Sequence, residues 1–191
     1  MNFNLLKADE DILENFYDIP ELKERCFKTP LVDLNLSTVY TKNIEAIVGR
    51  EELFSILFLS KKGDLKDYNI ISVTEPFQKT ISDSFEVDCN ALLQLEFTDI
   101  RKKLTTEQLE DKKDTISLIT TEQILEIINF ILTNKDKKFI INCDVGISRS
   151  PAIGILLETI LDNNEGINAI NDHHRYSPNK ILLEKFDTIL K

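Results

Sequence analysis

The sequence has little of what several protein classes depend on. Its 191 residues include only 5 glycines and 5 prolines, which excludes a collagen-like chain, and its many Leu, Ile and Phe residues argue against a disordered one. The three cysteines, Cys26, Cys89 and Cys143, are too few and too scattered for a disulfide scaffold. With only two histidines, His173 and His174, and no closely spaced cysteine pair, a metal site is not expected either. We therefore expect free thiols in a reducing compartment.

Positive charge is scarce as well. Lysine and arginine together number 23 against 33 aspartates and glutamates, so the formal net charge is −10. Such a chain lacks the basic field that attracts nucleic acids or anionic lipids. The strongest apolar stretch, residues 53–59, is far too short to span a bilayer, and the first residues lack the basic and apolar regions of a secretory signal. We therefore expect an acidic, soluble, cytoplasmic protein with neither a nucleic acid nor a membrane as partner.

Short apolar runs alternate with helical patterns along most of the chain. The runs typical of buried strands are 44–48, 69–73, 91–97 and 138–143, and residues 31–36 alternate like a further, half-buried strand. The predicted helices are the isoleucine-rich stretch 124–131, which follows a capping box of Thr120 and Gln123, and the segments 151–161 and 178–190. Residues 49–63 fit a helix or a strand, and the charged stretch 99–120 fits a disordered insertion or a working loop.

This alternation predicts an α/β fold. We expect a central, mostly parallel sheet of about four to five strands flanked by helices. Residues 41–191 would form this domain, and residues 1–40 would be an N-terminal extension that packs on the core.

The chemistry lies in the segment 139–154, FIINCDVGISRSPAIG. It places Cys143 at the end of a strand, then a five-residue turn, then Arg149 and a helix. Inward-facing amides of such a turn form an anion nest, and the helix N-terminus adds positive potential. Gly146 supplies backbone freedom, and the planar fork of Arg149 can bind two oxygens of a phosphate. A thiol in this field is favoured as thiolate, the form that attacks phosphorus.

This segment resembles the C-x5-R loop of the cysteine-dependent protein tyrosine and dual-specificity phosphatases, in the compact branch found in phages and bacteria. The resemblance implies Cys143 as nucleophile, Arg149 as phosphate ligand and Ser150 as donor to the sulfur. It also implies phosphate binding by the loop itself, residues Asp144, Val145, Gly146, Ile147 and Ser148. It requires no metal or organic cofactor, and it implies a dual-specificity-phosphatase-like fold.

The same resemblance implies an aspartic acid that protonates the leaving oxygen. The segment LEFTDI, 95–100, resembles the family's strand-end segment with this acid, so Asp99 is the candidate. Without that likeness Asp99 is an ordinary turn carboxylate, with Asp83, Asp88, Asp111 and Asp114 as competitors that no motif supports. The charged stretch after Asp99 also fits a flap that carries it over the site. The loop residue Asp144 would either steer the substrate or form an ion pair pointing outward.

The resemblance implies hydrolysis of phosphotyrosine, with phosphoserine and phosphothreonine as further substrates, in a protein or a small phosphoester. One departure is Asn142, where the family usually has histidine. An amide can donate a hydrogen bond but carries no charge. This departure favours an alternative function, that of a pseudophosphatase that binds phosphoproteins without turnover. A third hypothesis is a sulfur-transfer or arsenate-reducing enzyme. Against it, no second cysteine is suitably placed to resolve a disulfide. Cys89 could still act as a partner that protects an oxidised Cys143.

Overall fold

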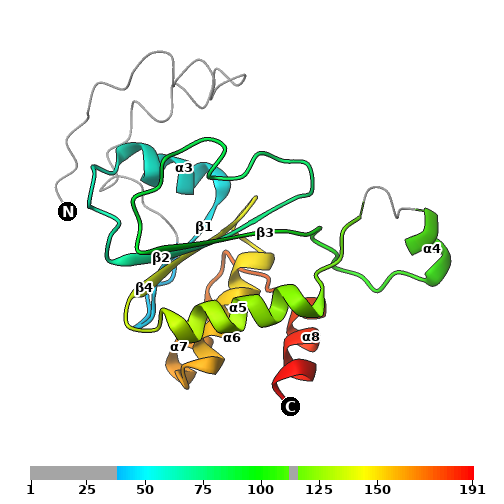
Figure 1. Cartoon of the computed structure of the whole chain (residues 1–191). Coiled ribbons are helices and arrows are strands. Elements are labelled where there is room, and N and C mark those ends of the chain that lie inside the picture. The colour runs from blue at the N-terminus through cyan, green and yellow to red at the C-terminus, as the bar shows by residue number, and fades with distance from the viewer. Residues whose placement is uncertain (1–37, 112–115) are drawn as a thin grey trace.

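A parallel sheet forms the centre of the molecule. The computed structural model describes residues 38–111 and 116–191. In this part of the chain the strands are β1 (Ile44–Gly49), β2 (Tyr68–Thr74), β3 (Ala91–Glu96) and β4 (Lys138–Cys143). All pair in parallel, in the order β1-β4-β2-β3 (Figure 1). The predicted α/β fold with a parallel sheet is therefore confirmed, whereas the predicted strand 31–36 and Cys26 lie outside the described residues.

Helices occupy most of the remaining chain. They are α3 (Arg50–Leu59), α4 (Thr106–Asp111), α5 (Thr121–Thr133), α6 (Arg149–Ile160), α7 (Asn164–Asp172) and α8 (Lys180–Leu190). The predictions of α5, α6 and α8 are confirmed, as is the capping box of Thr120 and Gln123 on α5. The ambiguous segment 49–63 holds a helix, which ends at Leu59 before Gly63. The sequence analysis missed α7, and it missed α4 within the charged stretch.

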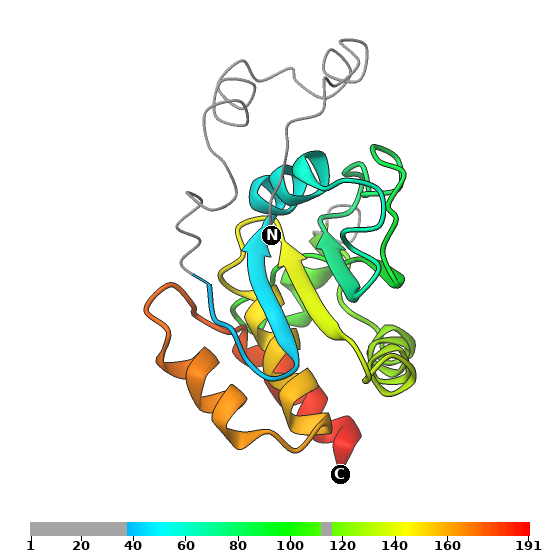
Figure 2. The ribbon, with the colours of Figure 1, turned by 90° about the vertical axis from the view of Figure 1, so that its left-hand side faces the viewer.

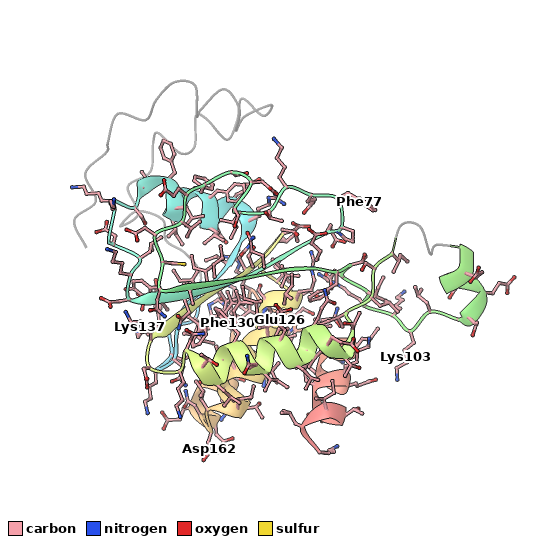
Figure 3. All side chains as sticks on the ribbon, viewed as in Figure 1. Phe77, Lys103, Glu126, Phe130, Lys137 and Asp162 are labelled. Atoms are coloured by element: carbon pink, nitrogen blue, oxygen red, sulfur yellow. The ribbon has the colours of Figure 1, made fainter. Side chains whose placement is uncertain are left out.

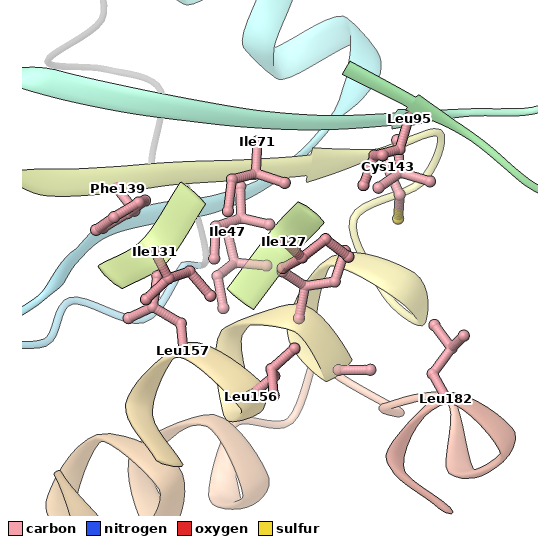
Figure 4. Packing of buried hydrophobic residues seen from close by; sticks show 14 of the residues in the cluster. Ile47, Ile71, Leu95, Ile127, Ile131, Phe139, Cys143, Leu156, Leu157 and Leu182 are labelled. Carbon is pink, nitrogen blue, oxygen red and sulfur yellow. The ribbon is translucent and has the colours of Figure 1, made fainter. Parts of the chain in front are cut away.

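The helices cover the two faces of the sheet in separate layers (Figure 2). On one face α3 packs on a small core whose strand residues are Ala46, Val48, Ile70 and Ile140. On the other face α5, α6, α7 and α8 pack on a larger core. Figure 4 shows its isoleucines from the sheet and α5, with the leucines of α6. Alternate residues of each strand enter different cores because side chains along a strand point to opposite faces.

The carboxyl ends of parallel strands meet at one edge, which is where α/β proteins commonly bind ligands. Phe77, on the loop after β2, marks this edge, and Lys137, just before β4, marks the opposite one (Figure 3). No helix in the described ranges is long and apolar enough to cross a membrane. The division between an extension, 1–40, and a domain, 41–191, stays a prediction. Of the predicted extension, the described residues Thr38 and Val39 are buried.

Candidate functional site

The cysteine loop, residues 143–149, lies at the carboxyl edge of the sheet between β4 and α6. Cys143 is the last residue of β4, and its side chain is buried. Its sulfur points away from the sheet on the side of α6 (Figure 4) and lies 3.2 Å from the Ser150 hydroxyl in the first turn of that helix. The structure thus joins Cys143 and Ser150 as the sequence analysis expects, while their catalytic roles stay predictions.

The turn of the loop depends on glycine at position 146. Gly146 has a φ of +74°, which L side chains rarely adopt, and a Cβ there would lie 2.5 Å from the Gly49 nitrogen. The Arg50 amide donates to the Asp144 carbonyl oxygen at 3.0 Å, so the loop is held against the end of β1. A side chain at residue 146 would push the loop off this support.

Arg149 is almost fully buried, with 3% of its surface exposed. Its Nη1 donates to the Phe97 carbonyl oxygen at 2.7 Å, and its Nη2 lies 2.9 Å from Glu75 and 3.3 Å from Asp144. Its Nε, also buried, has no hydrogen-bond partner within the described part of the chain. A buried guanidinium with one unused donor is a ready ligand for an anion, because an unsatisfied buried N–H costs free energy.

Asp99 lies beside the loop, three residues after the end of β3. Its Oδ1 accepts hydrogen bonds from Ser148 Oγ at 2.8 Å and Asn179 Nδ2 at 2.7 Å, and its Oδ2 from Arg101 Nε at 3.1 Å. Burial raises the pKa of Asp99, but these hydrogen bonds outweigh it, so the pKa lies below that of an ordinary aspartate. Asp99 is therefore within hydrogen-bond distance of the loop and is a carboxylate at neutral pH.

The predicted loop residues divide by exposure and by the direction of their contacts. Ser148 is buried and faces Asp99, Gly146 is buried, Ile147 is half-buried, and Val145 is exposed. Asp144 does not form only the outward ion pair that was one expectation: its carboxylate bridges Arg149 and Arg50, at 3.3 and 4.0 Å. The Asp144 carboxylate thus already pairs with the Arg149 guanidinium that would bind phosphate.

Two further side chains that the sequence analysis missed contact this site. Glu75, just after β2, binds Arg149 and accepts from the Asp99 amide at 3.3 Å. Asn179 caps α8 through its Oδ1 while its Nδ2 holds Asp99. The signals for them were a carboxylate directly after a buried strand and the helix-capping preference of asparagine after proline.

A third missed contact supports the outer wall of the loop. Arg175 forms two hydrogen bonds to Glu52 and a longer one, 3.4 Å, to the Val145 carbonyl oxygen. The Glu52 carboxylate raises the pKa of Arg175 and also accepts from the Gly49 amide. This pair ties α3 to the loop and keeps the Val145 carbonyl turned towards a cation.

Asn142, the departure from the family pattern, faces the α3 side of the sheet beside Ser72. Its Oδ1 and the hydroxyl oxygens of Ser72 and Thr74 are buried without hydrogen-bond partners among the described residues. Side chains alternate along β4, so Asn142 points away from the face on which Cys143 lies. Any influence of Asn142 on the sulfur therefore passes through the backbone of β4.

The competing residues lie apart from the loop or make other contacts. Asp83 binds Thr80 in a turn, and Asp88 accepts from the Gly63 amide. Asp114 and the side chain of Asp111 lie outside the described residues. Cys89 precedes β3 at the opposite edge of the sheet, roughly 20 Å along the strands from Cys143 at about 3.3 Å per residue. A disulfide between these two thiols would require the sheet to rearrange.

The histidines form a small ring stack. His173 stacks on Tyr176 with ring centroids 4.5 Å apart and on His174 at 4.9 Å. Within the described ranges no three His, Cys, Asp or Glu side chains gather closely enough to hold a metal ion.

Comparisons with known proteins give a partial likeness to a solved structure. No family model matches the chain, and no curated protein matches it. Among solved structures, the chain is similar to the one described as the crystal structure of Tk-PTP in the active form. The identity is 15% and the TM-score 0.43, over 66% of this chain and 80% of that one. This similarity is too low to carry an activity or a substrate to the present chain.

Proposed function

We propose that this chain is a cysteine-dependent phosphatase that hydrolyses phosphotyrosine esters, and phosphoserine or phosphothreonine esters as further substrates. The observation that carries the proposal is the buried Arg149 guanidinium, whose Nε donor is unused, in the same loop as the Cys143 thiol. Both lie where β4 meets the N-terminus of α6, which adds positive potential for an anion. The resemblance of this loop to the C-x5-R loop of the cysteine-dependent phosphatases supports the same proposal.

The reaction follows from these positions in two steps. The Cys143 thiolate attacks phosphorus, an S–P bond forms, the ester P–O bond breaks, and Asp99 gives a proton to the leaving oxygen. Water then attacks the phosphocysteine, Asp99 takes its proton, and the S–P bond breaks to release inorganic phosphate. The Ser150 hydroxyl, 3.2 Å from the sulfur, donates a hydrogen bond to the departing thiolate. The loop amides and Arg149 hold the phosphate oxygens throughout.

Asp99 suits the second step as it stands. Its lowered pKa keeps it ionised in the free protein, as a base requires. For the first step it must gain a proton, and an arriving phosphate dianion favours this because two negative charges in close proximity repel. The substrate in this proposal is a phosphorylated protein or a small phosphoester. The protein would meet it in a reducing, cytoplasmic compartment, where Cys143 is not oxidised.

A pseudophosphatase is the second candidate, and Asn142, where the family usually has histidine, favours it. Glu75 and Asp144 both engage Nη2 of Arg149, so a phosphate must compete with two carboxylates. This competition weakens phosphate binding and turnover alike, so it does not separate the two candidates. A protein that only binds phosphate would, however, have no use for the thiol next to Ser150.

The test is metal-free hydrolysis, with EDTA present, of phenyl phosphate and p-nitrophenyl phosphate. Cys143→Ser is expected to abolish turnover of both, and an alkaline, denaturing quench of wild type to trap a phosphorylated Cys143. Asp99→Asn is expected to slow phenyl phosphate by about 100-fold or more, the usual range for a lost general acid. It should slow p-nitrophenyl phosphate far less, because nitrophenolate leaves without a proton.

Matched variants separate these effects from general damage. Cys89→Ser removes a thiol, and Asp83→Asn a carboxylate, each away from the loop, so both should retain wild-type rates. Phosphate binding by wild type without any turnover would favour the pseudophosphatase and overturn the enzyme. Equal effects of Asp99→Asn on both esters would move the acid role to another residue.

A further inference from the structure

A cavity lies between the charged stretch that follows Asp99 and the start of α8. Its volume is about 260 Å³, slightly below the ~300 Å³ at which pockets for drug-sized ligands begin, so it suits a smaller molecule. None of the cysteine-loop residues 143–149 lines it, so it is distinct from the anion nest. Figure 3 marks one of its lining residues, Lys103, on the segment that leads to α4. Most of the remaining lining is aliphatic and consists of Ile100, Leu104, Leu118, Ile119, Ile181 and Leu182.

Two side chains, one on α8 and one at its N-cap, hold the walls of this cavity together. Asn179 Nδ2 donates to the Ile100 carbonyl oxygen at 3.0 Å, and also to Asp99 Oδ1 at 2.7 Å. Lys185 Nζ donates to the Ile119 carbonyl oxygen at 2.8 Å, so both ends of the charged stretch are tied to α8. A cavity with fixed apolar walls binds an apolar molecule without the free-energy cost of first forming the site.

The charged side chains around the cavity are cations. Lys102, Lys103 and Lys185 line it, and none of the described lining residues is an aspartate or a glutamate, although acidic residues outnumber basic ones by 33 to 23 in the chain. Lys103 pairs with Glu184 at 2.8 Å, whereas Lys102 is exposed. The Lys185 ammonium group gives one of its three donors to a carbonyl oxygen and keeps its charge. The cavity therefore combines an aliphatic interior with positive charge that suits one anionic group.

We propose that this cavity binds a small apolar molecule that carries one carboxylate. The hydrocarbon part would lie among the aliphatic side chains, and the carboxylate beside Lys102 and Lys185. Burial of the hydrocarbon contributes roughly fourfold in affinity for each methylene group. The lysines favour an acid over a neutral molecule of the same length. This site would bind its ligand whether or not the chain hydrolyses phosphate esters, so the proposal stands or falls apart from the proposed function.

The experiment titrates the isotope-labelled full chain with octanoate, hexanoate and 1-octanol and follows the amide chemical shifts. We expect octanoate to bind at one site, to shift amides around the cavity, and to bind about 15-fold more tightly than hexanoate, which has two methylene groups fewer. Lys102→Met and Lys185→Met remove a charge while they keep a long side chain. Each should weaken octanoate by about threefold and leave 1-octanol unchanged. Lys62→Met, in a different cavity beside the end of α3, is the matched control and should retain wild-type affinity.

A cavity-filling variant gives an independent test. Ile181→Trp places a ring in the cavity and should abolish octanoate binding, whereas Leu190→Trp adds the same ring on the same helix outside the cavity and should retain it. If circular dichroism shows that Ile181→Trp is unfolded, the lysine variants decide. The proposal is overturned by equal affinity for octanoate and 1-octanol, by unchanged octanoate affinity in both lysine variants, or by a loss of binding in Lys62→Met. The absence of saturable octanoate binding by about 10 mM would also overturn it, since even a modest ligand of this size binds in the millimolar range.

Discussion

At the scale of single residues, Asp99 shows how one nearby and two distant side chains set the charge state of a single carboxyl group. Ser148 from the cysteine loop, Asn179 from the start of α8 and Arg101 from its own turn all donate to its carboxylate. Donors of this kind stabilise the charged form of a carboxyl group. The same contacts that bring Asp99 to the loop therefore oppose its protonation, and this conflict has a consequence for pH dependence.

If Asp99 is the general acid, its carboxyl group must carry a proton when the ester bond breaks. Because the pKa of Asp99 is below its ordinary value, the protonated fraction falls as pH rises, and kcat/KM for phenyl phosphate should decline steadily from pH 5 towards pH 8. Asn179→Ala removes one donor and should move this decline to higher pH. The measurement is the pH profile of kcat/KM for both proteins. Identical pH profiles for the two proteins would show that Asp99 is not the group whose ionisation lowers kcat/KM.

Asp144 is the second residue with a testable charge. Its carboxylate lies 3.3 Å from Arg149 Nη2, where it competes with an incoming phosphate. Asp144→Asn should therefore bind inorganic phosphate or vanadate more tightly, by about three- to tenfold for one removed negative charge near the surface. Titration calorimetry on the Cys143→Ser background measures this directly. Weaker binding in Asp144→Asn would mean that Asp144 positions Arg149 instead.

At the scale of elements, the strand–loop–helix unit of β4, the cysteine loop and α6 depends on one turn. Gly146 lies so close to the end of β1 that backbone atoms, which cannot give way like a flexible side chain, fill the space of a Cβ. The loop is thus shaped by β1 as well as by its own residues. The loop can therefore hold this shape before any ligand binds.

Gly146→Ala should destroy the nest while the sheet survives. The Cβ would meet the Gly49 nitrogen and the Val48 carbonyl carbon at 2.5 Å, so we expect phosphate binding to fall by 100-fold or more, roughly the loss of two hydrogen bonds to a charged group. Gly63→Ala is the matched control, because Gly63 also has a positive φ but no atom lies within 4 Å of its Cβ position. Binding and circular dichroism on both variants test this. Equal losses in both would point to backbone strain alone.

At the scale of the whole molecule, two cores on opposite faces of the sheet hold the site, and a buried carboxylate joins the larger one to the entry of β1. Glu158 of α6 is fully buried and accepts from Thr41, from Asn43 at 2.6 Å and from Asn163 at 2.8 Å. These partners come from before β1 and before α7. Glu158 therefore links three segments far from the cysteine loop.

Glu158→Ala should lower the free energy of unfolding by about 3 kcal/mol, because it leaves several buried donors unsatisfied. Glu158→Gln, which preserves the shape and one acceptor, should lose less. Urea denaturation gives both values, and turnover per folded molecule should stay unchanged since Glu158 does not contact the loop. A stable Glu158→Ala protein would show that water replaces the carboxylate.

The sequence by itself determined the strands, most of the helices and the unit around Cys143. These are local patterns: buried strands appear as apolar runs, α5 as isoleucines at helical spacing after a capping box, and the cysteine loop as seven consecutive residues. Helix α7 was not predicted because most of its residues are polar and only Gly166 and Ile170 are buried, which leaves too weak an apolar pattern. The strand order was equally beyond a local pattern.

Tertiary structure alone decided which side chains meet the loop. Asp99 reaches Ser148 across 49 residues and Asn179 across 80, and Glu75 reaches Arg149 only because β2 lies next to β4 in the sheet. Such contacts depend on strand order and register, which no local pattern carries. The scarcity of basic residues argues against a broadly basic surface, but it does not conflict with the proposed phosphate site, because a buried arginine and a helix N-terminus lie together at the end of β4 in a chain of net charge −10.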